Sequence, residues 1–308
     1  MLLLAAAVLV ERQFVEMCQT SQRRLFDIIN GRAVAIILAG KSLSEFERRM
    51  EEFAGASICY FGLNSFHVQE DQLLWKIGRQ FDLLLITWPE EFRRQVDRIT
   101  SYLERDSQNA FITIKSNIAA LRVESPDRHG RLAQHKSKIL FLEDLNPPEA
   151  FRIRHHVNSA TIMLTSLIFS GCTSPIFVLG MDAKPNDASY YRQEQLESYR
   201  PITRDFTSDV YCFTQNWRIL LEVMRQRGLR RLPPILNYNM ESGVDLFPKI
   251  SYEFFLYLTG SPSIPVATAL ARIDPIGPAG SDGAYPSEET LEVSLRKMQE
   301  ALMVMDPW

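Results

Sequence analysis

The chain has few cysteines, no excess of basic charge and no long apolar run, and each of these shortages excludes a class of protein. Its four cysteines are widely separated and form no Cys-x-x-Cys pair; they are Cys18, Cys59, Cys172 and Cys212. This spacing argues against structural zinc, and free thiols in apolar contexts fit a reducing, cytoplasmic compartment. The net charge of -3 gives no global basic field of the kind that binds nucleic acid, so we expect no nucleic-acid partner.

The apolar stretch Met1–Val10 is too short to span a bilayer, lacks a basic n-region and is followed directly by Glu11 and Arg12. We expect it to form the first turns of a packed helix within an N-terminal helical segment over residues 1–30. The alternative is that this stretch lies on a membrane surface, at its inner face. At 308 residues the chain can form one large α/β domain or a domain with appendages, and we favour one main domain. The sequence has no internal repeat and no coiled-coil heptads.

What the chain does contain is an alternation of short apolar runs with helical patterns. The runs that predict strands are 34–39, 57–61, 81–87, 110–114, 138–142, 175–180 and 235–239. Helical spacing predicts helices over 67–80, 91–103, 155–170 and 209–226. Such alternation implies right-handed crossovers, and therefore an α/β, doubly wound, mainly parallel Rossmann-like sheet with helices on both faces.

The polar stretches and the two ends of the chain complete the predicted organisation. We assign the Rossmann-like domain to residues 31–259, and a Pro- and Gly-rich segment with a C-terminal helix to 260–308. The polar stretch 125–135 is expected to be a loop. The longer stretch 183–207 contains Tyr190 and Tyr191 and is unusually long and polar for a plain connection, so we expect it to form a lid.

The first strand is followed by a glycine and then by two overlapping helix-start signals. Gly40 allows a sharp turn, while Ser42 with Glu45 and Ser44 with Glu47 both have capping-box spacing. A helix that begins here with its free amides facing outward favours an anion, usually phosphate. This turn therefore suggests a nucleotide or nucleotide-sugar site; the alternative is a tight turn that binds nothing.

Ligands of doubly wound sheets bind at the carboxyl ends of the strands. This rule points to four loops, which we expect to gather around one crevice at a single edge of the sheet. They are Gly40–Ser42, Asn64–Phe66, Thr87–Pro89 and Gly180–Asp182.

The order of these segments, completed by the helix and strand from Asn158 to Asp182, resembles a group of Rossmann-like proteins. The group contains the family-42 sialyltransferases, the motility-accessory-factor glycosyltransferases and the hydroxymethyl-dihydropterin pyrophosphokinases. The likeness covers roughly residues 30–250. It implies a crevice that binds a nucleotide-activated sugar, with CMP-linked nonulosonic acid as the favoured donor.

The resemblance implies donor-binding roles for residues at matching positions: Gly40, Ser42, Leu43, Asn64, Pro89, Asn158, Ser159, Gly180 and Asp182. The first loop departs from the family pattern Gly-Asn-Gly-Pro-Ser-Leu, because Leu38 and Ala39 replace its first two residues and Lys41 replaces its proline. In the third loop Trp88 replaces an asparagine. Lys41 could instead supply a cation for a phosphate. Asn158 and Ser159 could equally be helix caps, and Asp182 a loop-capping carboxylate.

Transfer to a hydroxyl generally needs a base, which the sialyltransferase pattern supplies as a histidine after the Gly-x-Asp loop. All histidines here precede that loop: His67, His129, His135, His155 and His156. We therefore expect a carboxylate, Asp205 or preferably Asp209, to act as the base, with Tyr190 or Tyr191 donating a hydrogen bond to the leaving phosphate. No spacing favours a metal site.

Three functions are compatible with these residues. The first is a glycosyltransferase-like enzyme that needs no cofactor and transfers a sugar to a glycan or another hydroxyl acceptor. The second is a pyrophosphokinase-like phosphoryl transferase, which would need Mg²⁺ held by Asp182 and Asp205. The third is a non-catalytic descendant that binds a ligand or partner, which the altered first loop and the missing late histidine favour.

Overall fold

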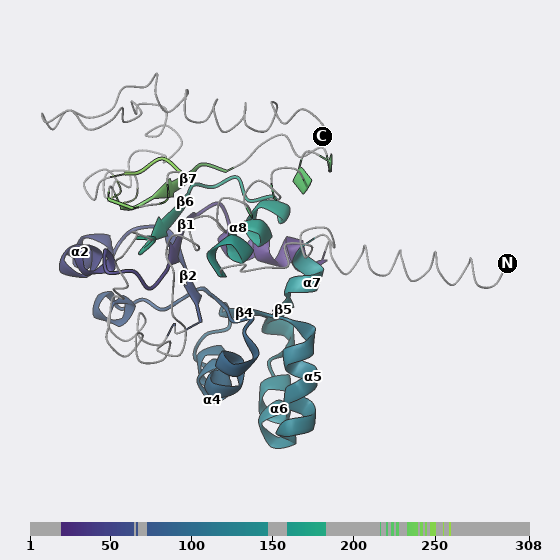
Figure 1. Cartoon of the computed structure of the whole chain (residues 1–308). Helices are drawn as coiled ribbons and strands as arrows, with labels where there is room; N and C mark the ends of the chain where they lie inside the picture. The colour runs from purple at the N-terminus through teal and green to yellow at the C-terminus, as the bar shows by residue number, and fades with distance from the viewer. Residues whose placement is uncertain are drawn as a thin grey trace, which may run out of the picture.

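The computed structural model describes residues 20–64, 66, 73–146, 159–182 and 233–239, together with shorter stretches and single residues between 216 and 259. This part of the chain contains a seven-stranded, all-parallel sheet (Figure 1). The strands are β1 (Ala33–Ile37), β2 (Ile58–Leu63), β3 (Leu83–Leu85), β4 (Ala110–Thr113), β5 (Ile139–Phe141), β6 (Ile176–Leu179) and β7 (Ile235–Asn237). Each corresponds to a run predicted from the sequence, and the predicted doubly wound fold class is confirmed.

The strand order is β5-β4-β3-β2-β1-β6-β7, so β1 lies near the middle of the sheet. From β1 the chain adds strands in one direction as far as β5, and then returns to place β6 on the other side of β1. Ile37 at the end of β1 is paired with Gly62 of β2 and with Leu179 of β6. The direction in which strands are added therefore reverses between β1 and β6. Open α/β sheets bind their ligands at such a reversal point.

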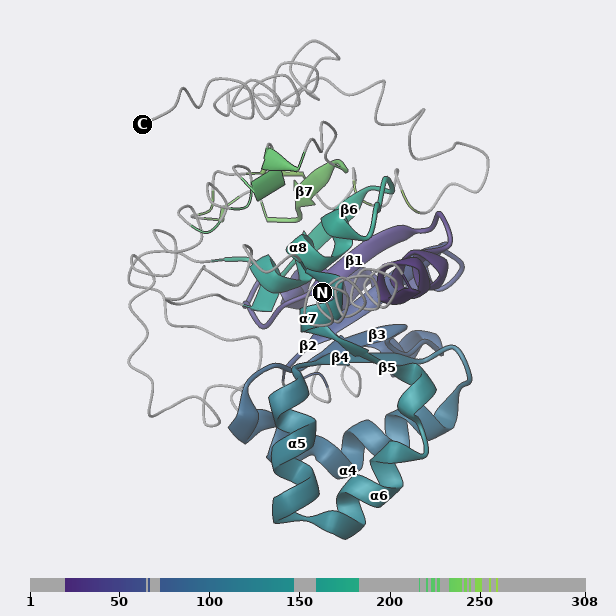
Figure 2. The same cartoon turned by 90° about the vertical axis from the view of Figure 1, so that its right-hand side faces the viewer.

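Helices cover both faces of the sheet. They are α2 (Leu43–Arg49), α4 (Pro89–Arg105), α5 (Lys115–Glu124), α6 (Pro126–Ala133), α7 (Leu142–Leu145) and α8 (Ser159–Phe169), with short 3-10 helices at Met50–Phe53, Leu74–Ile77 and Lys136–Lys138. Figure 2 shows α4, α5 and α6 grouped beside the β3–β5 part of the sheet. Residues 20–29 are also helical, and this helix ends at Asn30 and Gly31, both with positive φ.

Alternate residues of the buried strands belong to two separate cores. Ala35 and Ile37 of β1 pack on the same side of the sheet as Phe46 of α2. Val34 and Ile36 face the other side, where Met163 of α8 packs. Because both faces are covered, the strands are continuous apolar runs, which is why the sequence predicted them well.

Two predictions for the connecting segments differ from the structure. The stretch 125–135, expected to be a loop, contains α6. Leu132 is the residue of α6 that is buried, so the helix lacks an apolar stripe that the sequence could reveal. Pro126 occupies the first turn of α6, where proline suits a helix start. In the second stretch, 67–80, the described residues form the 3-10 helix Leu74–Ile77 and a turn at Gly78; residues 67–72 lie outside the described part.

Within the described residues, none of the helices combines the length and apolar character needed to cross a membrane. Residues 1–19, the lid prediction 183–207 and the C-terminal segment after residue 259 lie outside them.

The buried thiols predict how stability depends on pH. Burial raises the pKa of Cys59 well above its ordinary value of 9.0, and burial raises the pKa of Cys172 to about 11. Above pH 9 these thiols ionise in the unfolded chain but stay protonated in the folded one, so stability is full below pH 9 and decreases above it. We expect the free energy of unfolding to fall by about 1.4 kcal/mol per pH unit for each thiol.

Urea denaturation at pH 8, 9 and 10 measures this effect. Burial also raises the pKa of Tyr60, so its phenol adds to the slope at the upper end of the range. Cys172→Ala removes one thiol. The slope of the free energy of unfolding against pH should therefore become less steep by about 1.4 kcal/mol per pH unit. An unchanged slope in that variant would contradict the assignment.

Candidate functional site

The loops that follow β1 and β6 are in direct contact at the reversal point. The amide of Gly40 donates a hydrogen bond to the carbonyl of Gly180 at 3.0 Å, and Gly180 has a φ of 76°. A Cβ atom on Gly40 would lie 2.3 Å from that carbonyl oxygen and 2.7 Å from Cγ of Asp182. Gly40 must therefore be glycine because two backbones approach closely, and two of the residues predicted from the sequence are brought together.

The carboxylate of Asp182 connects three loops at this point. Its Oδ2 accepts a hydrogen bond from the Ser42 amide at 2.9 Å, and its Oδ1 accepts one from the Ser42 hydroxyl. Oδ1 also accepts a hydrogen bond from Nδ2 of Asn239 at 2.7 Å, which follows β7. The loops after β1, β6 and β7 are thus fixed to one another by a single side chain.

This arrangement corrects the capping-box prediction. The Ser42 side chain makes no capping hydrogen bond to α2, because its hydroxyl donates to Asp182 instead. The structure does place an anion at the start of α2, but it is the protein's own carboxylate. Leu43, predicted to contact the donor, is fully buried in the core.

A second polar contact joins the end of β2 to the start of α8. Nδ2 of Asn64 donates a hydrogen bond to the hydroxyl of Ser159 at 2.9 Å. Asn64 has a φ of 44°, which asparagine tolerates better than most residues. Its Oδ1 atom is buried, and among the described residues it has no hydrogen-bond partner. Ser159 begins α8, whose first amides have no acceptor within the helix.

Asn64 is supported from α4 by residues that the sequence analysis did not identify. Nε2 of Gln95 donates a hydrogen bond to the Asn64 carbonyl at 3.0 Å and another to the carboxylate of Glu91. Glu91 is 1% exposed and also accepts a hydrogen bond from Arg94. The sequence signal was the spacing of Glu91 and Gln95, four residues apart, which places both polar side chains on the same buried face of α4.

Pro89 lies in the first turn of α4, where its missing amide and fixed φ suit a helix start. The structure gives it this helical role and brings it into neither polar contact described above. Asn158, Tyr190, Tyr191, Asp205 and Asp209 lie outside the described residues, so their predicted roles stay predictions.

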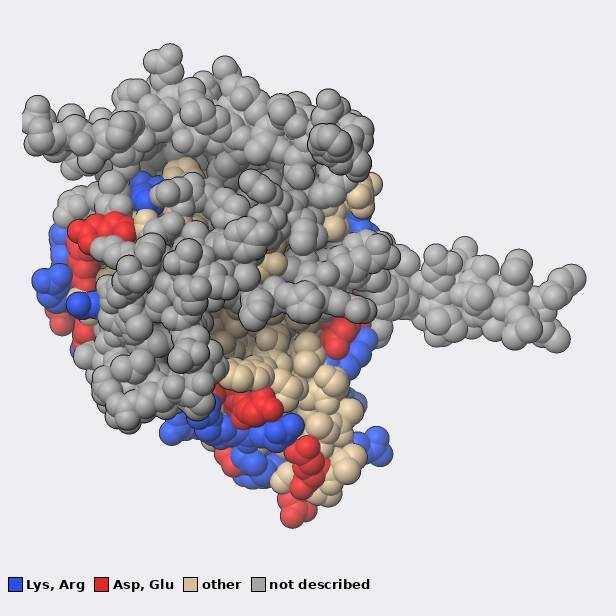
Figure 3. Space-filling view, in the orientation of Figure 1, with Lys and Arg blue, Asp and Glu red and all other residues tan. Residues whose placement is uncertain are grey.

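Charged residues on the described surface near α4 and α6 are of both signs (Figure 3). Asp97 accepts hydrogen bonds from Arg128 and Arg131, at 2.8 and 2.6 Å. The hydrogen bond from Arg128 and the two positive charges lower the pKa of the Asp97 carboxyl. No group of three or more His, Cys, Asp or Glu side chains suited to a metal ion occurs in the part of the chain that the structure describes.

Comparison of the chain with protein-family models, with curated proteins and with solved structures gave no match.

Proposed function

We propose that the protein is a glycosyltransferase-like enzyme that binds a nucleotide-activated sugar at the carboxyl edge of the sheet. CMP-linked nonulosonic acid is the favoured donor, and a glycan or another hydroxyl compound is the acceptor. The observation that supports this proposal best is the reversal of strand order between β1 and β6, with polar side chains from several strand ends beside it.

The contacts divide these side chains into two roles. Asp182, Ser42 and Asn239 satisfy one another and hold the loops, so we assign them a structural role beneath the proposed donor site. We assign ligand recognition to Asn64 and Ser159, because the buried Asn64 Oδ1 atom is an acceptor without a described donor. The amides at the start of α8 suit the donor phosphate, since the start of α2 already faces a carboxylate.

Four further residues of the proposed site lie outside the described part of the chain. Asn158 would add a polar contact beside Ser159, Asp209 would take the acceptor proton, and Tyr190 or Tyr191 would donate a hydrogen bond to the leaving phosphate. No cofactor is required for this chemistry.

Two alternatives differ in how well the contacts support them. A pyrophosphokinase-like reaction needs carboxylates free to bind Mg²⁺, whereas both oxygens of Asp182 already accept hydrogen bonds. A non-catalytic ligand-binding protein is the stronger second candidate. The hydrogen bonds of Asp182 favour this candidate. They place the Asp182 carboxylate at the start of α2, where the resemblance to the family's first loop implied a contact with the donor.

Nucleotide binding provides the test. We expect CMP and CMP-linked sugars to raise the stability of the whole chain, by about 2.7 kcal/mol at 100 times the dissociation constant. Asn64→Gly keeps the positive φ and deletes the amide, and should weaken binding by about tenfold through the loss of roughly one hydrogen bond. Ser159→Ala should act in the same direction. Thermal-shift titration measures all three effects.

Asn30→Gly is a matched control, because Asn30 also has a positive φ, of 47°, but ends the helix that precedes β1. It should leave CMP binding unchanged. Failure of CMP, other nucleotides and nucleotide sugars to shift the melting temperature at millimolar concentration would refute the donor site. Binding without hydrolysis or transfer of any donor sugar would favour the non-catalytic candidate.

A further inference from the structure

The backbone of Asn64 is held by three hydrogen bonds. Its amide donates to the Leu85 carbonyl of β3 at 3.1 Å. Its carbonyl accepts one hydrogen bond from the Phe66 amide at 2.8 Å and another from Nε2 of Gln95 at 3.0 Å. A non-glycine residue keeps a positive φ only when its surroundings hold it there. Of these three contacts, the one from Gln95 is made by a side chain and can be removed by substitution.

Two acceptors determine the orientation of the Gln95 amide. Glu91 lies four residues before Gln95 on α4, and its carboxylate accepts a hydrogen bond from Gln95 Nε2. The Asn64 carbonyl accepts a second one from the same nitrogen. Neither a carboxylate nor a carbonyl can donate, so the nitrogen of the Gln95 amide must face both of them. Glu91 therefore excludes the flipped amide, whose oxygen would face the Asn64 carbonyl.

Burial makes this pair of side chains costly. Glu91 is 1% exposed and Gln95 is 2% exposed, and the Glu91 carboxylate is paired with Arg94. Apolar side chains at such positions are often no less stabilising than a buried charged pair. The side chain of Glu90, 63% exposed, already places a negative charge in the first turn of α4 without this cost. The helix start therefore does not explain why a second carboxylate is buried beside Gln95.

The side chain of Asn64 gives the reason. Its Nδ2 donates to the Ser159 hydroxyl at the start of α8 at 2.9 Å, and its buried Oδ1 has no hydrogen-bond partner among the described residues. Both groups are carried by one short side chain, so a change in the backbone at Asn64 would move both away from α8. Gln95 opposes such a change because it holds the Asn64 carbonyl.

We propose that Gln95 and Glu91 are positioning residues for ligand recognition. Glu91 orients the Gln95 amide, and Gln95 holds Asn64 so that its side chain stays at the start of α8. The inference rests on the proposed nucleotide site, and it adds two residues of α4 that act on the ligand through Asn64.

NMR of the whole chain, labelled with ¹⁵N at asparagine, tests the position of Asn64 without any ligand. The side-chain NH2 signals of Asn64 are those that disappear in Asn64→Gly. We expect Glu91→Gln, which keeps the shape of the side chain but permits the flipped Gln95 amide, to shift these signals, and Gln95→Leu to shift them further. Glu91→Gln provides the test even if Gln95→Leu fails to fold. Unchanged Asn64 signals in the folded variants would overturn the proposal.

A double-variant cycle with CMP as the probe tests whether the pair acts through Asn64. We expect CMP to bind about tenfold more weakly to Gln95→Leu and about threefold more weakly to Glu91→Gln. In the Asn64→Gly background, each substitution should change the CMP dissociation constant by less than about twofold. Equal losses in both backgrounds would show that the pair acts elsewhere, which would overturn the proposal.

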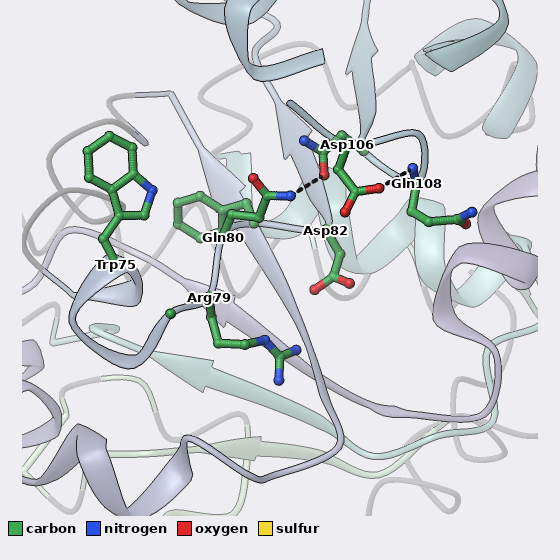
Figure 4. Close-up of a pocket in the computed structure, with 9 residues that line it drawn as sticks. Trp75, Arg79, Gln80, Asp82, Asp106 and Gln108 are labelled. Atoms are coloured by element: carbon green, nitrogen blue, oxygen red, sulfur yellow. Dashed lines mark hydrogen bonds between the residues drawn. The ribbon is translucent and has the colours of Figure 1, made fainter. Parts of the chain in front are cut away.

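Glu90→Gln and Asn109→Leu are the matched controls. Glu90 shares the first turn of α4 but is exposed. Asn109 is 3% exposed and donates from Nδ2 to the Tyr102 carbonyl at 2.7 Å, so it resembles Gln95 in burial and bonding. It lines a hollow at the amino edge of the sheet, where its side-chain oxygen accepts a hydrogen bond from Gln80 (Figure 4).

Asn109→Leu should lower the melting temperature, and both controls should leave the Asn64 signals and the CMP dissociation constant unchanged. A control that weakens CMP binding as much as Gln95→Leu would overturn the proposal. Two further results separate it from the donor site. If no nucleotide binds, the donor site is refuted and the NMR comparison still decides whether Gln95 positions Asn64. If CMP binds the wild type and Gln95→Leu equally, the donor site stands and the positioning role is refuted.

Discussion

Replacement of Gly40 by alanine is expected to lower the free energy of unfolding by about 3 kcal/mol or more. The added Cβ atom would lie 2.3 Å from the Gly180 carbonyl oxygen, which is backbone and cannot rotate away. The two loops must separate, and the hydrogen bonds between Asp182 and Ser42 are strained with them. Urea denaturation monitored by circular dichroism measures the loss, and CMP titration of the folded fraction measures its effect on the proposed nucleotide site.

Gly55→Ala is the control for this substitution. No atom lies within 4 Å of the position that a Cβ on Gly55 would occupy, so this variant should differ from the wild type by less than about 0.5 kcal/mol. A Gly40→Ala protein as stable as Gly55→Ala would mean that the loops after β1 and β6 are not in contact.

The second large effect is expected at Asp182. Asp182→Asn preserves the shape of the side chain but turns one acceptor oxygen into an amide donor. Either that amide faces the Ser42 N–H, or it faces Asn239 and the Ser42 hydroxyl, so at least one hydrogen bond to a charged acceptor is lost. We expect a loss of about 2–3 kcal/mol in the free energy of unfolding, measured by urea denaturation.

Ser42→Ala removes one hydroxyl donor and should cost about 1 kcal/mol. Because the two side chains share a hydrogen bond, the double variant should lose less than the sum of the single losses. Strict additivity would show that Asp182 does not depend on Ser42. A stable Asp182→Asn protein that has lost turnover would instead move Asp182 from a structural role into the chemistry.

The fold was predictable because its strands are marked locally. Strands buried on both faces are continuous apolar runs, and the alternation of these runs with helices restricts the sheet to a parallel, doubly wound one. One exception is α6, whose sequence predicts a loop because Leu132, its buried residue, makes too small an apolar stripe to detect. Its polar side chains are consistent with a helix that is mostly exposed.

The site was predictable only in part, because its contacts join residues far apart in the sequence. Gly40 and Gly180 could be identified since each follows a strand. The partner of Ser42 could not, because Asp182 is 140 positions away and a carboxylate is a stronger acceptor than the local options. Asn239 was missed for the same reason, and Glu91 because neighbouring Glu90 and Glu91 are chemically identical and differ only in the side of the helix on which they lie.

The position of β1 between β2 and β6 also determines the order in which the sheet can be assembled. Each strand from β1 to β4 pairs with the next strand along the chain, so these pairings close short segments. The pairing of Val34 with Ile176 must instead close a segment that includes β2, β3, β4, β5 and α8. We therefore expect the first five strands to form before β6 joins them. The loops after β1 and β6 come into contact only at that last step. A ligand that bound both loops would slow the detachment of β6 and β7 from the rest of the sheet.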